Sequence, residues 1–407
     1  MSAFAALHLP ELAASAALLQ PELVSLRRDL HRRPEIGLEL PETRARLLAA
    51  LDGLPLELTL GEGLSSITAV LRGGRPGPNV LLRADMDALP VQESGRLSYA
   101  STVPGAMHAC GHDLHMAVLV GAVRLLVERR AELPGNVVFM FQPGEEGQGG
   151  AQRMVDAGVL EAAGERVVAA YALHVAAALL PNGLVASRPG PVLAASDTLH
   201  VTLRGRGGHG SSPHSALDPV PAVCEAVLAL QSMVTRRIDA FDPVVLTVGT
   251  LSAGTAANVI PEEARFAATI RSFSDQSRRT VHAEALRVVH GIAAAHGLTA
   301  EAVLEDGYPV TVNDAVETAF AAEVVAGLLG AGRYMEMPKP IAGSEDFGVL
   351  GALVPSAYLM LGAVPTDGRD PFSAPYNHSP QAEFEDNVLA DGAALLAGLA
   401  LGRLARG

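Results

Sequence analysis

The stretch Asp113–Pro143, DLHMAVLVGAVRLLVERRAELPGNVVFMFQP, decides the fold that we predict. Its first part has helical apolar spacing and an acidic start, which suits a helix N-terminus. NVVFMFQ, at 136–142, is a short continuous apolar run before a proline, which is typical of a buried parallel strand. Similar strands are expected within 65–74, 79–90 and 167–175, and a charged helix over 22–53. Strands that alternate with helices predict an α/β domain with a mainly parallel sheet.

The pattern changes near Pro189. Residues 195–207 alternate like a half-exposed strand, and a helix, two alternating strands, a long helix and a last strand follow. This strand–helix–strand–strand–helix–strand order is the signature of a ferredoxin-like α+β domain. The helix and strand alternation returns after residue 313. We therefore expect a catalytic domain in two parts, 1–190 and 306–407, with a ferredoxin-like domain inserted at 191–305.

Composition excludes several classes of protein. The chain has 407 residues and a formal net charge of −14, with no Lys/Arg block, so neither nucleic acid nor an anionic membrane surface is an expected partner. No run of about 18 apolar residues predicts a membrane span. Two cysteines, Cys110 and Cys224, make no disulfide framework. We expect a reduced, cytoplasmic protein, because the N-terminus also lacks the basic region of a signal peptide.

The densest group of reactive side chains is MHACGHDLH, at 107–115. Cys110 and His112 stand two residues apart, directly before the helix that we expect from Asp113. A thiolate and an imidazole at such a turn can reach one point, and both are good ligands for zinc and neighbouring transition metals. The alternative is a buried structural cysteine with incidental histidines.

A second group, QPGEEG at 142–147, directly follows a predicted buried strand. Glu145 and Glu146 would lie at the carboxyl end of that strand, where open α/β sheets bind ligands. One carboxylate can hold a metal while the other acts as a general base. Taken alone, the pair is more often a solvated acidic loop. His174, after another apolar run, and His378, on a polar loop, mean little in isolation.

Together these positions offer one thiolate, three imidazoles and two carboxylates. Five ligands suit two metal ions about 3.5–4 Å apart that share bridging groups and leave room for a water. The sixth group, Glu145, would remain to deprotonate that water. Five metal ligands and one free general base are the groups that metal-assisted hydrolysis requires.

A family resemblance makes these roles specific. The chain resembles the aminoacylase/carboxypeptidase family of dinuclear metallopeptidases, most of all its amidohydrolase branch of hippurate hydrolases, auxin-conjugate hydrolases and N-acetyl-diaminopimelate deacetylases. The matching segments, in order from about residue 30 to 380, are LHRRPEIGLELPET, LLRADMDALPVQE, MHACGHDLH, FQPGEEGQGGA, ALHV, GRGGHGSSPH, ANVIPEE, GSEDF and NHSP. The resemblance implies two divalent metal ions (Zn, Mn, Co or Ni) and Glu145 as general base. The metal ligands that it implies are Cys110, His112, Glu146, His174 and His378.

One segment departs from the wider family. Where other members read His-x-Asp, with the histidine on a metal, this chain has Asp85-Met86-Asp87. We therefore assign no metal to Asp85. We expect Asp87 to orient a ligand imidazole, as a group behind the ligands commonly does.

The inserted domain carries a further set that is recognised by resemblance alone. GRGGHG, at 205–210, spells G-x-G-x-x-G, but Ser-Ser-Pro follows where a nucleotide-binding helix would begin, so we reject that reading. His209 resembles the histidine of a lid and dimerisation domain that stabilises the oxyanion in the partner subunit. Asn258 and Arg271 resemble residues that hold the substrate carboxylate. Without the resemblance, all three would be read as surface residues. The role of the Ser344-Glu345-Asp346 loop stays open.

The expected function is metal-dependent cleavage of the amide bond of N-acyl amino acids such as hippurate or N-acetyl-amino acids, by a homodimer or higher homo-oligomer. A carboxypeptidase or dipeptidase on the same scaffold is the first alternative. The second is a catalytically inactive binding protein, against which the retention of Glu145 beside five ligands argues. A serine hydrolase is disfavoured because no G-x-S-x-G motif is present.

Overall fold

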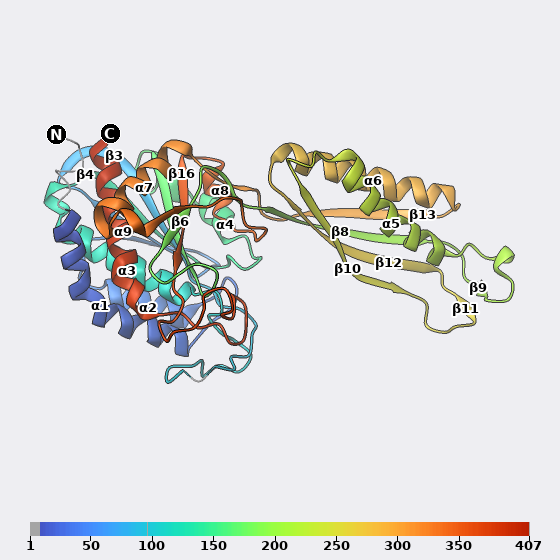
Figure 1. Cartoon of the computed structure of the whole chain (residues 1–407), viewed down its shortest axis with the longest axis horizontal. Helices are drawn as coiled ribbons and strands as arrows, with labels where there is room; N and C mark the ends of the chain where they lie inside the picture. The colour runs from blue at the N-terminus through green and yellow to red at the C-terminus, as the bar shows by residue number, and fades with distance from the viewer. Residues whose placement is uncertain (1–8, 96, 407) are drawn as a thin grey trace. The chain divides into compact units, whose positions relative to one another are not determined.

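A computed structural model describes residues 9–95 and 97–406, which form two compact units (Figure 1). The larger unit consists of residues up to 192, residues 312–339 and residues from 349 onward. The smaller unit consists of residues 193–311 and 340–348. The chain leaves the larger unit through β7 (Gly190–Leu193) and returns through β14 (Thr311–Asn313).

The larger unit is built on an eight-stranded sheet of order β1-β2-β4-β3-β5-β16-β6-β15. Its strands are β1 (Glu57–Leu60), β2 (Ile67–Arg72), β3 (Arg75–Asp85), β4 (Pro134–Gln142), β5 (Ala169–Ala176), β6 (Val185–Ser187), β15 (Tyr334–Glu336) and β16 (Ser356–Gly362). The central strands β4, β3, β5 and β16 run parallel, whereas β2 pairs antiparallel with both β1 and β4, and β6 with β16. The sheet is therefore mixed, with its parallel part at the centre.

Helices α1, α3 and α9 pack against one another and form the main helical layer of this unit (Figure 1). Helix α3 is buried along almost its whole length, because it lies between the sheet and the other helices. The helices of the unit are α1 (Leu9–Arg32), α2 (Pro41–Leu51), α3 (His112–Glu128), α4 (Gly150–Asp156), α7 (Ala315–Leu329), α8 (Gly348–Gly351) and α9 (Leu389–Arg406).

The helix that we expected over 22–53 is wrong in its extent. It is two helices, because α1 begins at Leu9 and ends at Arg32, and α2 begins only at Pro41. Pro34 explains the break, since proline lacks an N–H and disfavours helical geometry at the residue before it. Pro41 in turn suits the first turn of a helix, where its N–H is not needed.

Helix α9 and the short turn before it, Asp386–Arg406, are long and apolar enough to cross a membrane by length and composition. However, 78% of its most apolar window is buried inside the protein. It packs on α1, α3 and α7 and on strands β3, β4 and β5. This apolar helix is therefore accounted for as a core helix of the larger unit.

The smaller unit has a four-stranded antiparallel sheet of order β10-β12-β8-β13. The chain order is β8 (Ala195–Arg204), α5 (Pro219–Arg237), β10 (Val244–Ala253), β12 (Glu263–Ser272), α6 (Asp275–Ala295) and β13 (Thr299–Asp306). This order and strand arrangement are ferredoxin-like. Its own apolar core lies between the sheet and the two helices. Two short strands, β9 (Gly208–His209) and β11 (Val259–Ile260), pair with each other beyond one end of the sheet (Figure 1).

Candidate metal centre

The parallel centre of the larger sheet brings three loops to one edge. β3, β4 and β5 are neighbours that run in the same direction, so their carboxyl ends lie together. Asp87 follows β3, Glu145 and Glu146 follow β4, and His174 lies near the end of β5. The strand arrangement thus explains why residues 87 positions apart in the sequence meet in space.

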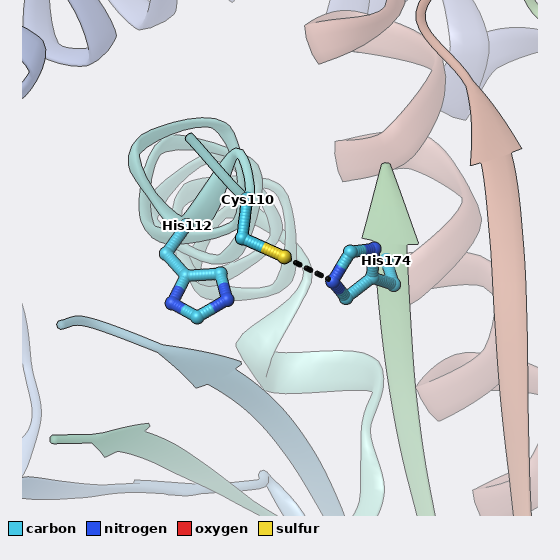
Figure 2. A group of neighbouring side chains, drawn as sticks. All are labelled: Cys110, His112 and His174. Carbon is cyan, nitrogen blue, oxygen red and sulfur yellow. Dashed lines mark hydrogen bonds between the residues drawn. The ribbon is translucent and has the colours of Figure 1, made fainter. Parts of the chain in front are cut away.

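The turn before α3 adds Cys110 and His112. Gly111, between them, has a φ of +82°, and a Cβ there would lie 2.3 Å from Val175 Cγ2. Glycine is therefore required at this turn, both for the backbone conformation and for the close approach of β5. Figure 2 shows the Cys110 sulfur directed at the His174 ring, and the ligand atoms of Cys110, His112 and His174 lie within 4.8 Å of one another.

The Cys110 sulfur lies among ligands from distant parts of the chain. It is 3.4 Å from His174 Nε2 (Figure 2) and 3.1 Å from His378 Nε2. His378 Nε2 also lies 3.2 Å from Glu146 Oε1. His378 has a φ of +71°, rare for a non-glycine residue, and its N–H donates to the Ala109 carbonyl at 2.8 Å. The fold therefore holds His378 against Cys110 at a cost in backbone strain.

Two of the histidines are held through Nδ1, which leaves Nε2 without a proton. His174 Nδ1 donates to the Val175 carbonyl at 2.8 Å, and His112 Nδ1 donates to the Asp87 carbonyl at 2.7 Å. A carbonyl only accepts, so the proton of each ring lies on Nδ1. His112 Nε2 is buried, has no hydrogen-bond partner in the part of the chain that the structure describes, and lies 3.7 Å from Asp85 Oδ2. This is how metal-binding imidazoles are commonly held, with one nitrogen bonded to the protein and the other facing the metal.

The carboxylate of Asp87 holds the loop that carries Glu145 and Glu146 through hydrogen bonds to its main chain. Its two oxygens accept hydrogen bonds from the main-chain N–H groups of Glu145 and Glu146, at 2.9 and 3.0 Å. The Asp87 main-chain carbonyl, rather than the carboxylate, is what bonds the His112 ring. Burial raises the pKa of the Asp87 carboxyl to about 6. Asp87 thus positions both an imidazole and the Glu145–Glu146 loop.

The charges at this cluster fit bound cations. Burial alone would lower the pKa of His112, yet Asp85, Asp87 and Glu146 raise it. Burial and the nearby glutamates raise the pKa of the Cys110 thiol well above its ordinary value. The carboxylates therefore create a point that attracts positive charge, and the thiol needs such a charge to ionise. Ligand atoms of Cys110, His112 and His174 lie within 4.8 Å of one another, as do those of Cys110, Glu146 and His378.

Asp85, to which we assigned no metal, also lies beside the cluster, as does His115, which its place in MHACGHDLH makes a candidate for supporting the ligands from behind. His115 Nδ1 donates to Asp85 Oδ1 at 2.6 Å, and His115 Nε2 accepts from the Val175 N–H at 2.9 Å. Both ring nitrogens of His115 are therefore used within the protein. Asp85 is further paired with Arg83 at 2.5 Å. These contacts fix Asp85 and His115 next to the predicted metal ligands.

A buried ionic network holds the start of α3 from the other side. Asp113, next to the predicted ligand His112, forms an ion pair with Arg27, with 2.7 Å between Oδ2 and Nε, and accepts a hydrogen bond from His31 Nδ1 at 2.8 Å. Arg27 also pairs with Asp386 at 3.1 Å. Burial would raise the pKa of Asp113, but Arg27 and His31 lower it below its ordinary value. Helix α1 is thereby tied to the ligand-bearing turn.

His209 and Asn258 are brought together in the smaller unit. His209 on β9 is paired with Val259 on β11, and the Gly210 N–H donates to the Asn258 carbonyl at 2.9 Å. Both residues are exposed. The His209 ring is held from its Nδ1 side by Ser211, whose N–H donates at 3.1 Å. The Nε2 side of the ring is left for another partner.

Arg271 lies at the other end of the same unit. Its Nη1 donates to Ser344 Oγ at 2.9 Å, which gives the Ser344 loop a contact that the sequence did not predict. Burial lowers the pKa of Arg271, against an opposing effect of Asp197. β12 runs from Glu263 to Ser272, so at roughly 3.3 Å per residue about 26 Å of strand separate the His209 end from Arg271.

Comparisons with known proteins agree with this arrangement. The sequence pattern of the peptidase family M20/M25/M40 matches residues 81–402. A thermostable carboxypeptidase of Saccharolobus solfataricus is 35% identical over 383 residues, which cover 93% of this chain and 94% of that protein. An IAA-amino acid hydrolase of Arabidopsis thaliana is 37% identical over 382 residues, 93% of this chain and 84% of that protein.

A solved structure gives the same result. A Bacillus subtilis protein described as a dinuclear metal binding peptidase of the M20 family matches with a TM-score of 0.81 and 31% identity, over 95% of this chain and 99% of that one. Its description and the ligand cluster found here point to the same type of centre. The chain belongs to the peptidase family M20/M25/M40, and it is a hydrolase.

Proposed function

We propose that this protein hydrolyses the amide bond of N-acyl amino acids with a metal-activated water and Glu145 as general base. The observation that carries the proposal is the cluster itself. Side chains from positions 110 to 378 meet around one sulfur, with contacts of 3.1 and 3.4 Å. Glu145 lies in the same cluster, with a ligand atom within 4.8 Å of those of His112 and Glu146.

The proposed ligands of two divalent metal ions are Cys110, His112, Glu146, His174 and His378. When bound, such ions polarise the substrate carbonyl and lower the pKa of a water toward neutrality. The donor set of thiolate, imidazole and carboxylate suits Zn, Co, Ni or Mn. His378 is 54% exposed and Cys110 is buried, so His378 is the ligand on the solvent side, where substrate would enter.

Glu145 is the proposed proton carrier. Its main-chain N–H donates to Asp87, which holds this part of the loop near the proposed ligands. It would take a proton from the attacking water and deliver it to the leaving amine nitrogen. Transfer to the amine is required because an amide nitrogen leaves poorly without a proton.

The proposed substrate carries a carboxylate, which Arg271 and Asn258 would bind. Arg271 is half-buried, and its one side-chain hydrogen bond among the described residues goes to the Ser344 hydroxyl, so its planar guanidinium can also bind a carboxylate. The name of the Arabidopsis relative, an IAA-amino acid hydrolase, describes a substrate of this class. N-acyl amino acids supply both the amide and the carboxylate.

We further propose that residues 191–305 act as a lid and dimerisation domain and that His209 acts on the substrate of a partner subunit. His209 lies beyond the Glu263 end of β12 and Arg271 lies near its other end, so about 26 Å of strand separates the His209 side from Arg271, and Asn258 lies on the His209 side. A small N-acyl amino acid cannot span that distance. If His209 and Arg271 contact one substrate, they must come from different subunits, with His209 donating to the developing oxyanion.

An exposed apolar surface on this unit supports self-association. β10 is an edge strand of the sheet, and Val245 and Leu251 on it are 44% and 50% exposed. Leu228, on the neighbouring α5, is 72% exposed. Edge strands and exposed apolar side chains of this kind are common in interfaces between subunits. The two cysteines are unpaired, which fits the cytoplasm as the place of action.

A carboxypeptidase or dipeptidase activity is the second candidate, favoured by the name of the Saccharolobus relative. Both reactions use the same ligands and the same base, and they differ in the group that fills the acyl pocket. Parallel assays with hippurate, N-acetyl-amino acids and dipeptides, together with the metal content of the purified protein, separate the two. We expect two metal equivalents per chain and the highest kcat/KM on an N-acyl amino acid. Preference for dipeptides would replace the first proposal by the second, and turnover that survives complete chelation of metals would refute both.

A further inference from the structure

Asn377, directly before the proposed ligand His378, contacts three separate segments. Its Oδ1 accepts from the Ala177 N–H at 2.9 Å. Its Nδ2 donates to the Val175 carbonyl at 3.0 Å and to the Cys110 carbonyl at 3.4 Å. These partners fix the orientation of the amide, because only its oxygen can accept from an N–H and only its nitrogen can donate to carbonyls.

The Val175 carbonyl is shared between Asn377 and a ligand. It also accepts from His174 Nδ1 at 2.8 Å, the hydrogen bond that leaves Nε2 as the bare nitrogen of that ring. On its other side, the Val175 N–H donates to His115. Asn377 therefore bonds to the same oxygen that sets the tautomer and the orientation of the His174 imidazole.

The Cys110 sulfur is the second point of contact. Asn377 Nδ2 lies 3.8 Å from Sγ, within reach of a weak N–H···S hydrogen bond. A donor N–H directed at the sulfur helps to fix the position of the Cys110 side chain. The chain neighbour His378 approaches the same sulfur.

We propose that Asn377 is the positioning residue of the metal centre, which holds Cys110, His174 and His378 in the arrangement that binds metal. This inference rests on the ligand set of the proposed function. Asn377 would not bind the metal itself, because both of its polar atoms are engaged with the main chain. It acts through the three ligands, which come from the turn before α3, from β5 and from the loop before α9.

The test is a titration of the metal-free protein with Co²⁺, followed by the sulfur-to-cobalt charge-transfer absorption. Asn377→Asp keeps the size of the side chain and the oxygen that accepts from the Ala177 N–H. It replaces the Nδ2 donor by an oxygen, which would then face the Val175 and Cys110 carbonyls and the Cys110 sulfur. We expect Co²⁺ affinity to fall by about 10–100-fold, as for other groups that orient ligands. We also expect the absorption to move to longer wavelength, because the sulfur loses its donor.

Asn377→Ala removes the donors without adding charge, and we expect a smaller loss of affinity with the same direction of spectral change. It also carries the test if thermal melting shows that Asn377→Asp does not fold. The matched control is Asn79→Asp at the other end of β3, where Nδ2 donates to the Glu165 carbonyl at 2.6 Å and Oδ1 accepts from Asn136. This control should keep wild-type Co²⁺ affinity and spectrum.

The outcomes separate this inference from the proposed function. Wild-type affinity and wild-type absorption in the Asn377 variants would overturn the positioning role alone. An equal loss in Asn79→Asp would overturn it as well, because the effect would then belong to the fold in general. If the wild-type protein showed no sulfur-to-cobalt absorption, Cys110 would not be a ligand, and the proposed ligand set would fail together with the inference.

Discussion

The two units hold their functional residues in contrasting ways. In the larger unit, the proposed ligands are held by hydrogen bonds within the protein. His112 and His174 each donate to a main-chain carbonyl, and the Asp87 carboxylate accepts from the main-chain N–H groups of the Glu145–Glu146 loop. In the smaller unit, His209 and Asn258 are exposed, and Arg271 has a single hydroxyl partner among the described residues. Under the proposed function, this difference separates a centre that binds metal before substrate arrives from groups that gain partners only with substrate or a second subunit.

The adjacent residues Glu145 and Glu146 have different proposed roles, general base and metal ligand, and the variants at these two positions should give the largest effects. Glu145→Gln should lower kcat by about 10²–10⁴-fold, because a general base is lost, while metal content stays at the wild-type level. Glu146→Gln should instead lower metal content. Kinetics on an N-acyl amino acid and elemental analysis of both variants check this. If Glu145→Gln lost its metals and Glu146→Gln kept them, the two roles would have to be exchanged.

A variant of His209 tests whether the smaller unit contributes a residue to the active site of a partner subunit. His209→Ala should reduce kcat by about 10²–10³-fold through loss of an oxyanion donor. The exposed neighbour His214, changed to alanine, is the control and should leave kcat unchanged.

Mixing subunits extends this test. Reassociated His209→Ala and Glu145→Gln chains should regain about a quarter of wild-type activity, since half of the dimers are mixed and each mixed dimer has one intact site. No recovery in verified mixed dimers would place His209 in its own subunit's site, against the 26 Å argument.

Arg271 should affect binding more than chemistry. Arg271→Ala is expected to raise KM by about 10–100-fold, the loss of a charge-assisted hydrogen-bond pair, with a smaller change in kcat. Arg265→Ala is the matched control, because Arg265 lies on the same strand but pairs with Glu263 at 2.5 Å. An equal rise in KM for a substrate analogue without a carboxylate would show that Arg271 has another role.

The smallest expected effect concerns the stability of the smaller unit. Burial would raise the pKa of Asp197, but Arg278, the Gly307 N–H and His282 lower it below its ordinary value. Asp197→Asn should therefore cost about 2 kcal/mol of unfolding free energy at pH 7. A carboxyl with a lowered pKa stabilises the fold above about pH 4 and loses this contribution as pH falls through its folded-state pKa. Urea denaturation should show a constant difference from pH 7 to 5 that shrinks toward pH 3; a difference that grew on acidification would contradict the assignment.

Much of the fold could be predicted from apolar patterns, and the exceptions have physical causes. The central strands β3, β4 and β5 are continuous apolar runs because both of their faces are buried. Strands β6 and β15 contain only three residues each, and β1 is fully exposed, so none of them leaves a pattern in the sequence. Residues 340–348 belong to the smaller unit although they lie far from it in the sequence, which local patterns cannot reveal.

The candidate site shows the same limit. Clusters such as Cys110 and His112 are visible because reactive residues stand close together in the sequence. Asn377 was not assigned a role, and His115 was only a candidate for supporting the ligands from behind, since their importance lies in contacts with Val175, more than 50 positions away. Their proximity to His378 and His112 in the sequence was the one available signal. Side chains that position ligands are ordinary residues, and only the folded chain shows what they touch.

The most direct test of the central claim is crystallography of the metal-loaded protein with anomalous scattering at the metal edge. We predict two anomalous peaks about 3.5–4 Å apart, with Cys110, His112, Glu146, His174 and His378 as protein ligands and Glu145 bound to neither ion. A single peak, a peak without Cys110 at about 2.3 Å, or a Glu145 oxygen in direct coordination would contradict it.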